Sequence, residues 1–335
     1  MQRLSNHLHI AVGDYDRTRP IIDGSIGFSG FTTKVITGDL EEIFAEAFQR
    51  ATFDVTELSF SNYLIASSRG ECPYLALPIF PSRSFRHSAI YMRSDSGIQS
   101  PVDLRGKRIG CREYSNTASL VVRGVLADEY GFQPESSEWL VGDIDYVERT
   151  SIDERNWPKT GLRIKGVTGK TLGNMLVDGE LDALIAYKPP TVYGRGNNIV
   201  RLFPDWRAVE KDYYRRTKHF PIMHVMAVRK DVLQSHAGVI ESLMEGFVKA
   251  KDLAQSRLST HQAHPVMLPW LSAEHEETQA VMGQDFWPYG LTENLDILDT
   301  QIRWSHQQGL IPRVYETSEL FATAESARFH CKERF

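Results

Sequence analysis

The sequence predicts an α/β fold made of two lobes. Strand-like and helix-like segments alternate over most of the 335 residues, which indicates helices layered on sheets. A chain of this length is typical of two domains. Two strand-like segments, 87–93 and 221–229, are expected to cross between the lobes. Residues 1–93 plus 224–335 would then form lobe 1 and residues 94–223 lobe 2, with the ligand cleft between them.

Lobe 1 is predicted from its apolar periodicity. Residues 8–12 and 53–60 have the pattern of strands, and another strand is expected at 75–80. Over residues 39–51, apolar side chains recur every three or four positions, as in an amphipathic helix that faces a sheet. Ser61 is expected to cap the helix that follows the second strand.

Lobe 2 is predicted to begin with a strand and a long helix. The helix covers residues 117–130 and ends at Gly131, because glycine readily adopts the backbone conformation of a helix C-terminus. Residues 143–170 lack periodicity and are expected to form a polar excursion. The other predicted elements are strands at 107–111, 138–141, 182–187 and 221–228, and helices at 171–178, 231–257, 293–308 and 318–330, which make the C-terminal region helical.

Composition narrows the class of protein. The formal net charge of −5 and the pI near 6.1 exclude a global basic surface for nucleic acid. No apolar run approaches the roughly 20 residues needed to span a bilayer. Residues 1–13 lack the apolar core of a secretory signal, and Cys72, Cys111 and Cys331 fit neither a disulfide framework nor a zinc site. We therefore expect a cytoplasmic protein with no membrane or nucleic-acid partner.

Polar side chains follow several of the predicted strands. Ligands of open α/β sheets bind outside the carboxyl ends of the strands, near helix N-termini, so these side chains are candidate ligand contacts. Arginine suits a carboxylate because its planar fork forms two parallel hydrogen bonds. The predicted substrate-binding residues are Asp14, Arg17, Arg19, Ser61, Arg83, Ser84, Glu113, Tyr114, Asn116, Thr117, Tyr187 and Lys188.

Four motifs together resemble the 4,5-dihydroxyphthalate decarboxylase family: Gly13-Asp-Tyr-Asp-Arg-Thr-Arg19, Phe80-Pro-Ser-Arg-Ser-Phe-Arg-His87, Phe220-Pro-Ile-Met-His224 and Gly283-Gln-Asp-Phe-Trp-Pro-Tyr-Gly290. The resemblance extends over the whole chain. It implies a periplasmic-binding-protein-like (type II) fold and non-oxidative conversion of 4,5-dihydroxyphthalate to protocatechuate. The segments Glu113-Tyr-Ser-Asn-Thr-Ala118 and Tyr187-Lys-Pro-Pro190 depart from the family pattern, at places where the cleft is expected.

Aromatic decarboxylation sets the roles that a site must supply. The ring accepts a proton at the carbon that carries the carboxylate, and a para hydroxyl stabilises the resulting cation. The enzyme then needs a proton donor, a partner for the phenol and an anchor for the remaining carboxylate. Histidine titrates near neutrality, so the predicted catalytic residues are His87 and His224, with Arg86. Carboxylate binding is assigned to Arg17, Arg19, Arg83 and Arg86, and phenol contacts to Glu113, Tyr114 or Asp14.

Plainer interpretations stay open. The two histidines are also consistent with structural roles, and Arg83 and Arg86 with salt bridges between lobes. The same fold suits a solute-binding protein for an aromatic acid or sulfonate, or another cytoplasmic biosynthetic enzyme. Residues 261–276 contain three histidines but no zincin spacing, so no metal site and no cofactor are predicted, while dependence on a divalent metal stays open. The expected partner is a small aromatic carboxylate. Whether a second copy of the chain also binds stays open, since Phe286, Trp287, Trp304 and Phe321 in the C-terminal third fit an interface as well as a core.

Overall fold

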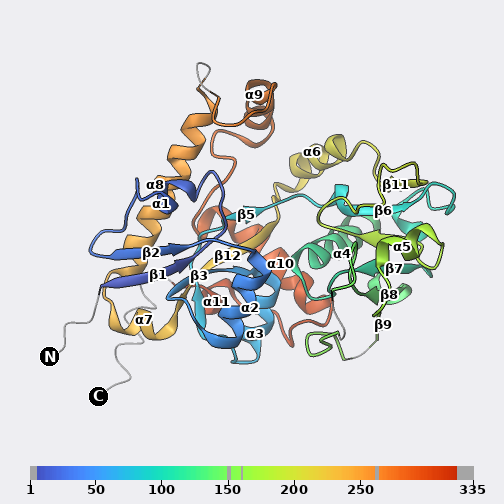
Figure 1. Ribbon diagram of the computed structural model, residues 1–335, viewed down its shortest axis with the longest axis horizontal. Coiled ribbons are helices and arrows are strands. Elements are labelled where there is room, and N and C mark those ends of the chain that lie inside the picture. Colours follow the sequence, from blue (N-terminus) through green and yellow to red (C-terminus); the bar gives the residue numbers. More distant parts are fainter. Residues whose placement is uncertain (1–5, 149–151, 160, 261–263, 323–335) are drawn as a thin grey trace. The chain divides into compact units, whose positions relative to one another are not determined.

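The chain folds into two compact units, and the computed structural model describes residues 6–148, 152–159, 161–260 and 264–322 (Figure 1). The first unit comprises Met1–Arg83, Ile222–Leu298 and Tyr315–Phe335. The second unit comprises Ser84–Pro221 and Asp299–Val314. Each unit holds its own mixed sheet with helices packed on it, so the α/β class and the discontinuous two-lobed organisation predicted from the sequence agree with the structure.

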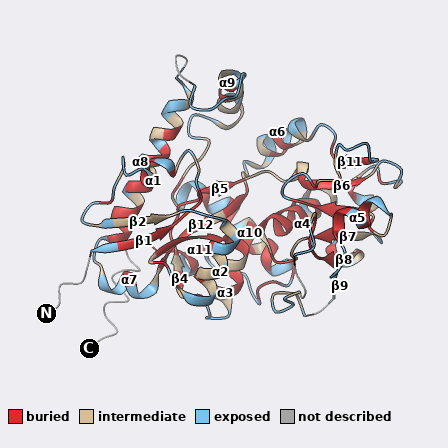
Figure 2. Cartoon of the chain, in the orientation of Figure 1, coloured by how far each residue is buried: buried red, intermediate tan, exposed pale blue. Residues whose placement is uncertain are grey.

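The first unit is built on a six-stranded sheet of order β2-β1-β3-β12-β4, with β5 also paired to β12. Strands β1, β2 and β3 run parallel, and β12 is antiparallel to β3, β4 and β5. Strand β3 is buried along its whole length, as expected for the middle of a sheet (Figure 2). The strands are β1 (His7–Ala11), β2 (Thr32–Ile36), β3 (Val55–Ser59), β4 (Tyr74–Ala76), β5 (Ser82–Arg83) and β12 (Ile222–Arg229).

Helices cover the first sheet (Figure 1). Helix α2 packs against β3 and α3 against β12, while α1 packs against α8. Asp39 caps α2 by accepting hydrogen bonds from the backbone N–H groups of Glu41 and Glu42, which explains where this helix begins. The helical elements are α1 (Arg19–Ile22), α2 (Leu40–Arg50), α3 (Phe60–Ser68), α7 (Lys230–Ser235), α8 (Val239–Leu258), α9 (Leu271–Met282), η4 (Thr292–Asn294) and α11 (Thr317–Leu320), and α10 (Leu295–Gln307) continues into the second unit.

The second unit is built on a six-stranded sheet of order β11-β6-β10-β7-β8-β9. Strands β10, β7, β8 and β9 run parallel to one another, whereas β6 is antiparallel to both β10 and β11. The strands are β6 (Ile90–Arg93), β7 (Arg108–Cys111), β8 (Glu138–Val141), β9 (Arg163–Gly166), β10 (Ala183–Ile185) and β11 (Ile199–Arg201). The helical elements are η1 (His87–Ala89), η2 (Pro101–Leu104), α4 (Thr117–Tyr130), η3 (Pro134–Ser136), α5 (Leu172–Val177) and α6 (Trp206–Thr217).

Helix α4 has the bounds that the sequence predicts. The side chain of Asn116 accepts a hydrogen bond from the Ser119 backbone at the N-terminus, and Gly131 ends the helix with φ of +63°. Helix α10 packs on α4 closely enough that a Cβ at Gly124 would lie 2.1 Å from the Trp304 ring. Trp304 therefore belongs to the core, as does Phe321, and only Phe286 and Trp287 of the predicted interface aromatics keep partial exposure.

The structure differs from the predicted boundaries of the lobes. Residues 84–93, predicted in lobe 1, belong to the second unit because β6 forms hydrogen bonds with β10 and β11. Residues 299–314 also belong to the second unit, where the C-terminal half of α10 packs on α4. The predicted strand 87–93 starts only at Ile90, because His87–Ala89 forms a 3-10 turn.

Other elements correct the sequence interpretation. Ser61 does not cap α3: the helix begins at Phe60, and Ser61 is buried inside it. The predicted helix 231–257 is interrupted at Gly238, which has φ of +78° and separates α7 from α8. Residues 143–170 contain β9, an exposed edge strand whose polar side chains gave no apolar pattern. A helix was predicted at 318–330. The observed helix α11 ends at Leu320, and residues 323–330 lie outside the described residues.

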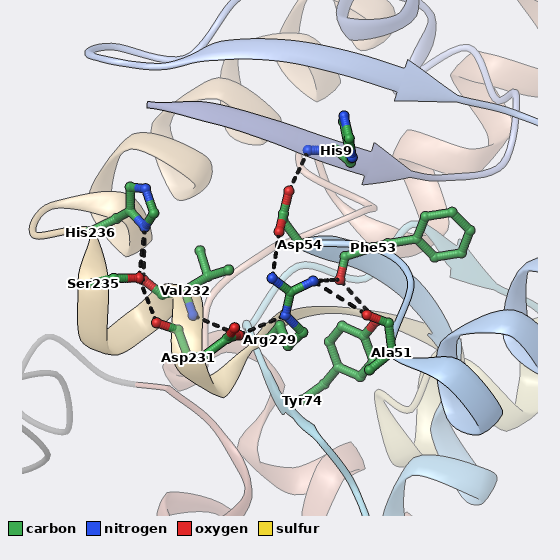
Figure 3. A network of polar contacts seen from close by, with 10 residues as sticks. All are labelled: His9, Ala51, Phe53, Asp54, Tyr74, Arg229, Asp231, Val232, Ser235 and His236. Carbon is green, nitrogen blue, oxygen red and sulfur yellow. Dashed lines mark hydrogen bonds and ion pairs between the residues drawn. The ribbon is translucent and has the colours of Figure 1, made fainter. Parts of the chain in front are cut away.

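A network of polar contacts ties together one end of the first sheet (Figure 3). Arg229, the last residue of β12, pairs with Asp54 at 2.8 Å and with Asp231 at 2.6 Å. Asp54 also accepts a hydrogen bond from the His9 backbone N–H at 2.8 Å. These contacts tie β12 to the start of β3 and to β1. They support the strand register that places residues at the other end of β12. Among the described residues, no helix is long and apolar enough to cross a membrane.

Candidate functional site

Strand pairing places Glu57 and His224 on one face of the first sheet. In the antiparallel pair of β3 and β12, His224 lies opposite Ser59 and Met226 lies opposite Glu57. Directly opposed residues point to the same face, and so do residues two positions apart on one strand. Glu57 and His224 are therefore diagonal neighbours, and His224 Nδ1 lies 2.6 Å from Glu57 Oε1.

Glu57 is the centre of a group that we call the Glu57 network: Gly13, Tyr15, Glu57 and His224. The Glu57 side chain has no exposed surface. Its Oε1 accepts a hydrogen bond from the Tyr15 hydroxyl at 2.7 Å, and its Oε2 accepts one from the Gly13 backbone N–H at 2.8 Å. A buried carboxylate is expensive unless its oxygens are satisfied, and here both oxygens have donors.

The loop after β1 delivers Gly13 and Tyr15 to this carboxylate. Thr18 shapes the loop, since its hydroxyl donates to the Gly13 carbonyl at 2.6 Å and accepts from the Tyr15 N–H at 2.9 Å. The loop folds so tightly that a Cβ at position 13 would lie 2.6 Å from the Tyr15 ring. Glycine at position 13 therefore lets the Tyr15 ring pack directly against the backbone. This packing explains why the motif begins with Gly13.

Arg17 is clamped between two aromatic rings of the first unit. Its guanidinium carbon lies 4.2 Å from the centroid of the Tyr15 ring and 4.2 Å from that of the Trp287 ring. Nε donates to the Pro81 carbonyl, and Nη1 pairs with Asp16 at 2.9 Å. Trp287 is itself fixed, since its Nε1 donates to the Phe80 carbonyl at 2.9 Å. The guanidinium plane is thus held in one orientation, which suits recognition of a planar carboxylate.

Like Tyr15, His224 is a partly exposed member of the Glu57 network. Its side chain keeps 19% of its surface exposed, and its ring packs edge-on against Phe44 with centroids 5.0 Å apart. Nδ1 is occupied by Glu57, whereas Nε2 forms no hydrogen bond with the described part of the chain. Burial, followed by the charge of Glu57, raises the pKa of the Tyr15 phenol far above its usual range, so Tyr15 stays a hydrogen-bond donor.

The other predicted site residues of the first unit lie in different surroundings. Asp14 and Arg19 are exposed and pair with each other at 2.5 Å. Arg83 is buried and donates to the Pro288 carbonyl at 2.8 Å and to the Asn294 side chain, so its guanidinium holds the 283–294 segment. Of the predicted arginines of this unit, Arg17 is the one whose guanidinium is held on the ring of Tyr15, a member of the Glu57 network.

His87 and Arg86 belong to the second unit, whereas His224 belongs to the first. His87 is buried beside Phe203 and Tyr213, and its Nδ1 lies 3.9 Å from Glu210 Oε1, which is beyond hydrogen-bonding distance. The adjoining cavity, lined also by α4, has room for about one water molecule, which is too little for an aromatic acid.

Burial shifts the acid–base behaviour of this second-unit group. It lowers the pKa of His87 to about 4, with the charge of Arg216 acting in the same direction. It lowers the pKa of Arg86 to about 10 and raises that of Glu210 to about 7. His87 is therefore neutral at pH 7 and enclosed by aromatic rings, which is the environment of a packed core histidine.

The remaining predicted contacts of the second unit are divided between core and surface. Tyr114 is fully buried, with the Arg123 guanidinium 3.6 Å from its ring centroid, which makes it a core residue. Asn116 caps α4, and Thr117 is the buried first residue of that helix. Ser84 donates to the Phe85 carbonyl at 2.9 Å, Glu113 is half-buried, and Tyr187 and Lys188 are exposed.

Comparison with known proteins agrees with the sequence motifs. A 4,5-dihydroxyphthalate decarboxylase of Comamonas testosteroni is 40% identical over 323 residues, which cover 96% of this chain and 98% of that protein. A second 4,5-dihydroxyphthalate decarboxylase, from Pseudomonas putida, is 39% identical over 210 residues, which cover 62% of this chain and 81% of that protein. The chain belongs to the 4,5-dihydroxyphthalate decarboxylase family. The family resemblance stated from the four motifs is thereby confirmed.

The fold of this decarboxylase family member is that of periplasmic binding proteins. Residues 29–154 match the family described as ABC transporter, phosphonate, periplasmic substrate-binding protein. The periplasmic aliphatic sulphonate binding protein SsuA from Escherichia coli aligns with a TM-score of 0.54 at 11% identity, over 96% of this chain and 93% of that chain. The alkanesulfonate-binding protein SsuA from Xanthomonas axonopodis pv. citri aligns with a TM-score of 0.51 at 12% identity, over 96% and 100%. These structures confirm the predicted type II fold.

The sequence did not lead us to include Glu57 and Trp287 in the candidate site. An acidic residue in the middle of an otherwise buried strand was a usable signal for Glu57, because such a carboxylate must have partners. Trp287 lies inside the Gly283–Gly290 motif but was interpreted only as a core or interface residue. Among the described residues, no group of three or more histidine, cysteine, aspartate or glutamate side chains is arranged to hold a metal ion, and His261 lies outside them.

Proposed function

We propose that this chain is a carboxy-lyase that converts 4,5-dihydroxyphthalate to 3,4-dihydroxybenzoate (protocatechuate) and CO2. Family membership over nearly the full chain supports the reaction. The single structural observation that carries the proposal is the chain of contacts from Arg17 through Tyr15 and Glu57 to His224. It joins a guanidinium held in one orientation to a partly exposed imidazole through a buried carboxylate.

The chemistry of this substrate matches such a pair of groups. 4,5-Dihydroxyphthalate is symmetric, and each carboxylate is para to one hydroxyl, so either can be lost. Protonation of the ring carbon that bears one carboxylate gives a cation stabilised by the para oxygen. The C–C bond then breaks, its electron pair restores the aromatic ring, and CO2 leaves. The net change is one proton gained and one CO2 lost, and no oxidant is needed.

Each residue of the pair has a distinct role in the proposal. The His224 imidazolium delivers its Nε2 proton to the ring carbon and is left neutral with its remaining proton on Nδ1, and a proton from solvent then restores the imidazolium. Nε2 is the accessible nitrogen because Nδ1 is engaged by Glu57. Arg17 binds the carboxylate that stays, with Tyr15 and Trp287 keeping the guanidinium plane fixed. His87 receives a structural role, because it is buried beside aromatic rings and the adjoining cavity has room for about one water molecule, and Arg86, which lines the same cavity, receives one with it.

Several finer points are part of the same proposal. Glu113, Tyr187 and Lys188 stay predicted substrate contacts of the second unit, and the ligand cleft between the lobes stays a prediction. We place the enzyme in the cytoplasm, which is supported by the low cysteine content of the chain and by the burial of the Cys72 and Cys111 side chains. Self-association also stays a prediction, which light scattering of the purified protein would test.

Incubation of the purified protein with 4,5-dihydroxyphthalate tests the proposal. Chromatography should detect 3,4-dihydroxybenzoate in an amount equal to the CO2 released. Phthalate is the matched control, because it has both carboxylates but no hydroxyl to stabilise the ring cation, and it should not react. Tight binding of 4,5-dihydroxyphthalate without turnover would instead support a solute receptor and refute the proposed reaction.

A further inference from the structure

We propose that Glu57 is a positioning residue that holds one His224 proton on Nδ1, so that Nε2 is the nitrogen that gains the catalytic proton and delivers it to the reacting carbon. This inference rests on the proposed function for its catalytic meaning. Its physical content concerns the Glu57 network alone. No motif pointed to Glu57, and it acts through His224 without touching the substrate.

The hydrogen bonds of Glu57 decide where the shared proton lies. The Gly13 backbone N–H can only donate, so Oε2 must accept. The Tyr15 hydroxyl stays protonated and bonds Oε1 at 2.7 Å, so Oε1 also accepts. Two donated hydrogen bonds favour the ionised carboxylate, which can only accept, so the proton in the 2.6 Å contact between Oε1 and Nδ1 belongs to the imidazole.

The position of Glu57 makes this arrangement rigid. Its side chain is fully buried on β3, which is flanked in the sheet by β1 and β12. The donor Gly13 follows β1, and His224 lies on β12, so three neighbouring backbone segments fix the carboxylate from different sides. A carboxylate that orients an imidazole through Nδ1 leaves Nε2 free for proton transfer, which is the role of the aspartate in serine-protease triads.

A purely structural role is the competing interpretation. Glu57 also ties the loop after β1 to the sheet, and any substitution that loosened this loop would lower activity. The two roles differ in their effect on the imidazole. Only a positioning residue determines which ring nitrogen of His224 carries the proton.

Glu57→Gln separates the two roles because its amide must reverse the tautomer. The Gly13 N–H requires an acceptor, so the amide oxygen faces Gly13 and the amide NH2 faces His224 and Tyr15. The NH2 then donates to Nδ1, and the proton of the neutral ring moves to Nε2. We expect kcat to fall by about 100-fold or more, as for loss of an oriented acid or base, with KM changed by less than about 3-fold since Arg17 is untouched.

The decisive readout is 15N NMR of ring-labelled histidine, recorded at a pH where the His224 ring is neutral. The His224 signals are identified by their absence in His224→Gln. Wild type should have the proton on Nδ1, and Glu57→Gln should have it on Nε2. Tyr15→Phe is the matched control: it removes one donor but leaves the carboxylate, so the proton should stay on Nδ1 and the ring should still cover Arg17.

Each outcome supports or overturns the inference. A wild-type proton on Nε2, or unchanged kcat in Glu57→Gln, would overturn it. If Glu57→Gln does not fold, the tautomer of His224 in wild type still tests the inference. Glu57→Asp, which keeps the charge, should retain the Nδ1 tautomer and part of the wild-type kcat. Failure of the proposed function is distinguishable, because wild type would then show the Nδ1 tautomer without any turnover of 4,5-dihydroxyphthalate.

Discussion

Replacement of Arg17 by methionine should weaken substrate binding far more than replacement of Arg19. Both arginines belong to one sequence motif, but their surroundings differ. Arg17 is held between the Tyr15 and Trp287 rings with its side chain 16% exposed, whereas the Arg19 side chain is 56% exposed and pairs with Asp14. Methionine preserves the length and apolar packing of the side chain and removes the charge.

The magnitude follows from the charge-assisted hydrogen bonds that Arg17 would make to the retained carboxylate. Such bonds contribute about 1.5–3 kcal/mol, and 1.4 kcal/mol corresponds to a factor of ten. Arg17→Met should therefore lower kcat/KM by about 10- to 150-fold. Most of the change should appear in KM, because the anchor binds ground state and transition state alike. Loss of two cation–π contacts should also reduce the free energy of unfolding by about 1–2 kcal/mol.

Steady-state kinetics on Arg17→Met, Arg19→Met and wild type measure the effect, with urea unfolding to report stability. We expect Arg19→Met to stay within about 3-fold of wild type, since an exposed salt bridge contributes about 0–1 kcal/mol. If the two variants raised KM equally, or if Arg17→Met left KM unchanged, the assignment of the carboxylate anchor to Arg17 would be refuted.

Three further changes test other parts of the account. Gly13→Ala should lower the free energy of unfolding by about 1–3 kcal/mol and reduce kcat, because the added Cβ would lie 2.6 Å from the Tyr15 ring. Thermal unfolding and steady-state kinetics measure the two effects, and unchanged stability and kcat would contradict the close approach in this loop. His87 has a pKa near 4 in the folded protein and about 6.5 in the unfolded chain, so the free energy of unfolding of wild type should fall by up to about 3 kcal/mol as pH falls from 6.5 to 4. Urea unfolding of His87→Leu should show no such fall, and the variant should retain turnover. Glu210 has a pKa near 7 in the folded protein and about 4.5 in the unfolded chain, so its contribution to the free energy of unfolding is present below pH 4.5 and declines by up to about 3 kcal/mol as pH rises to 7. Glu210→Gln should remove this decline. If either variant kept the pH dependence of wild type, the effect assigned to burial of that residue would be refuted.

Elements with strong local signals were predictable from the sequence. Helix α4 has its predicted bounds because Asn116 and Gly131 act at its two ends without help from distant residues. Strand β8 was also predicted with its observed bounds, since it lies in the interior of the sheet and is mostly apolar. Strand β9 was missed because an exposed edge strand needs no apolar alternation.

The candidate site was only partly predictable because its geometry depends on distant residues. Arg17 and Arg83 look equivalent in sequence, yet Arg83 bonds Asn294, which is 211 positions away. Glu57 acquires its role from Gly13, 44 positions before it, and from His224, 167 positions after it. His87 and His224 likewise follow similar motifs, and only burial distinguishes the enclosed imidazole from the accessible one.

The most direct test of the central claim compares wild type with His224→Gln on 4,5-dihydroxyphthalate in D2O. We expect wild type to release one CO2 for each 3,4-dihydroxybenzoate formed, with one deuterium at the vacated ring carbon. His224→Gln should form this product at least about 100-fold more slowly while binding the substrate with similar affinity. No CO2 from wild type would contradict the proposed reaction, and equal rates for the two proteins would contradict the role of His224 as proton donor.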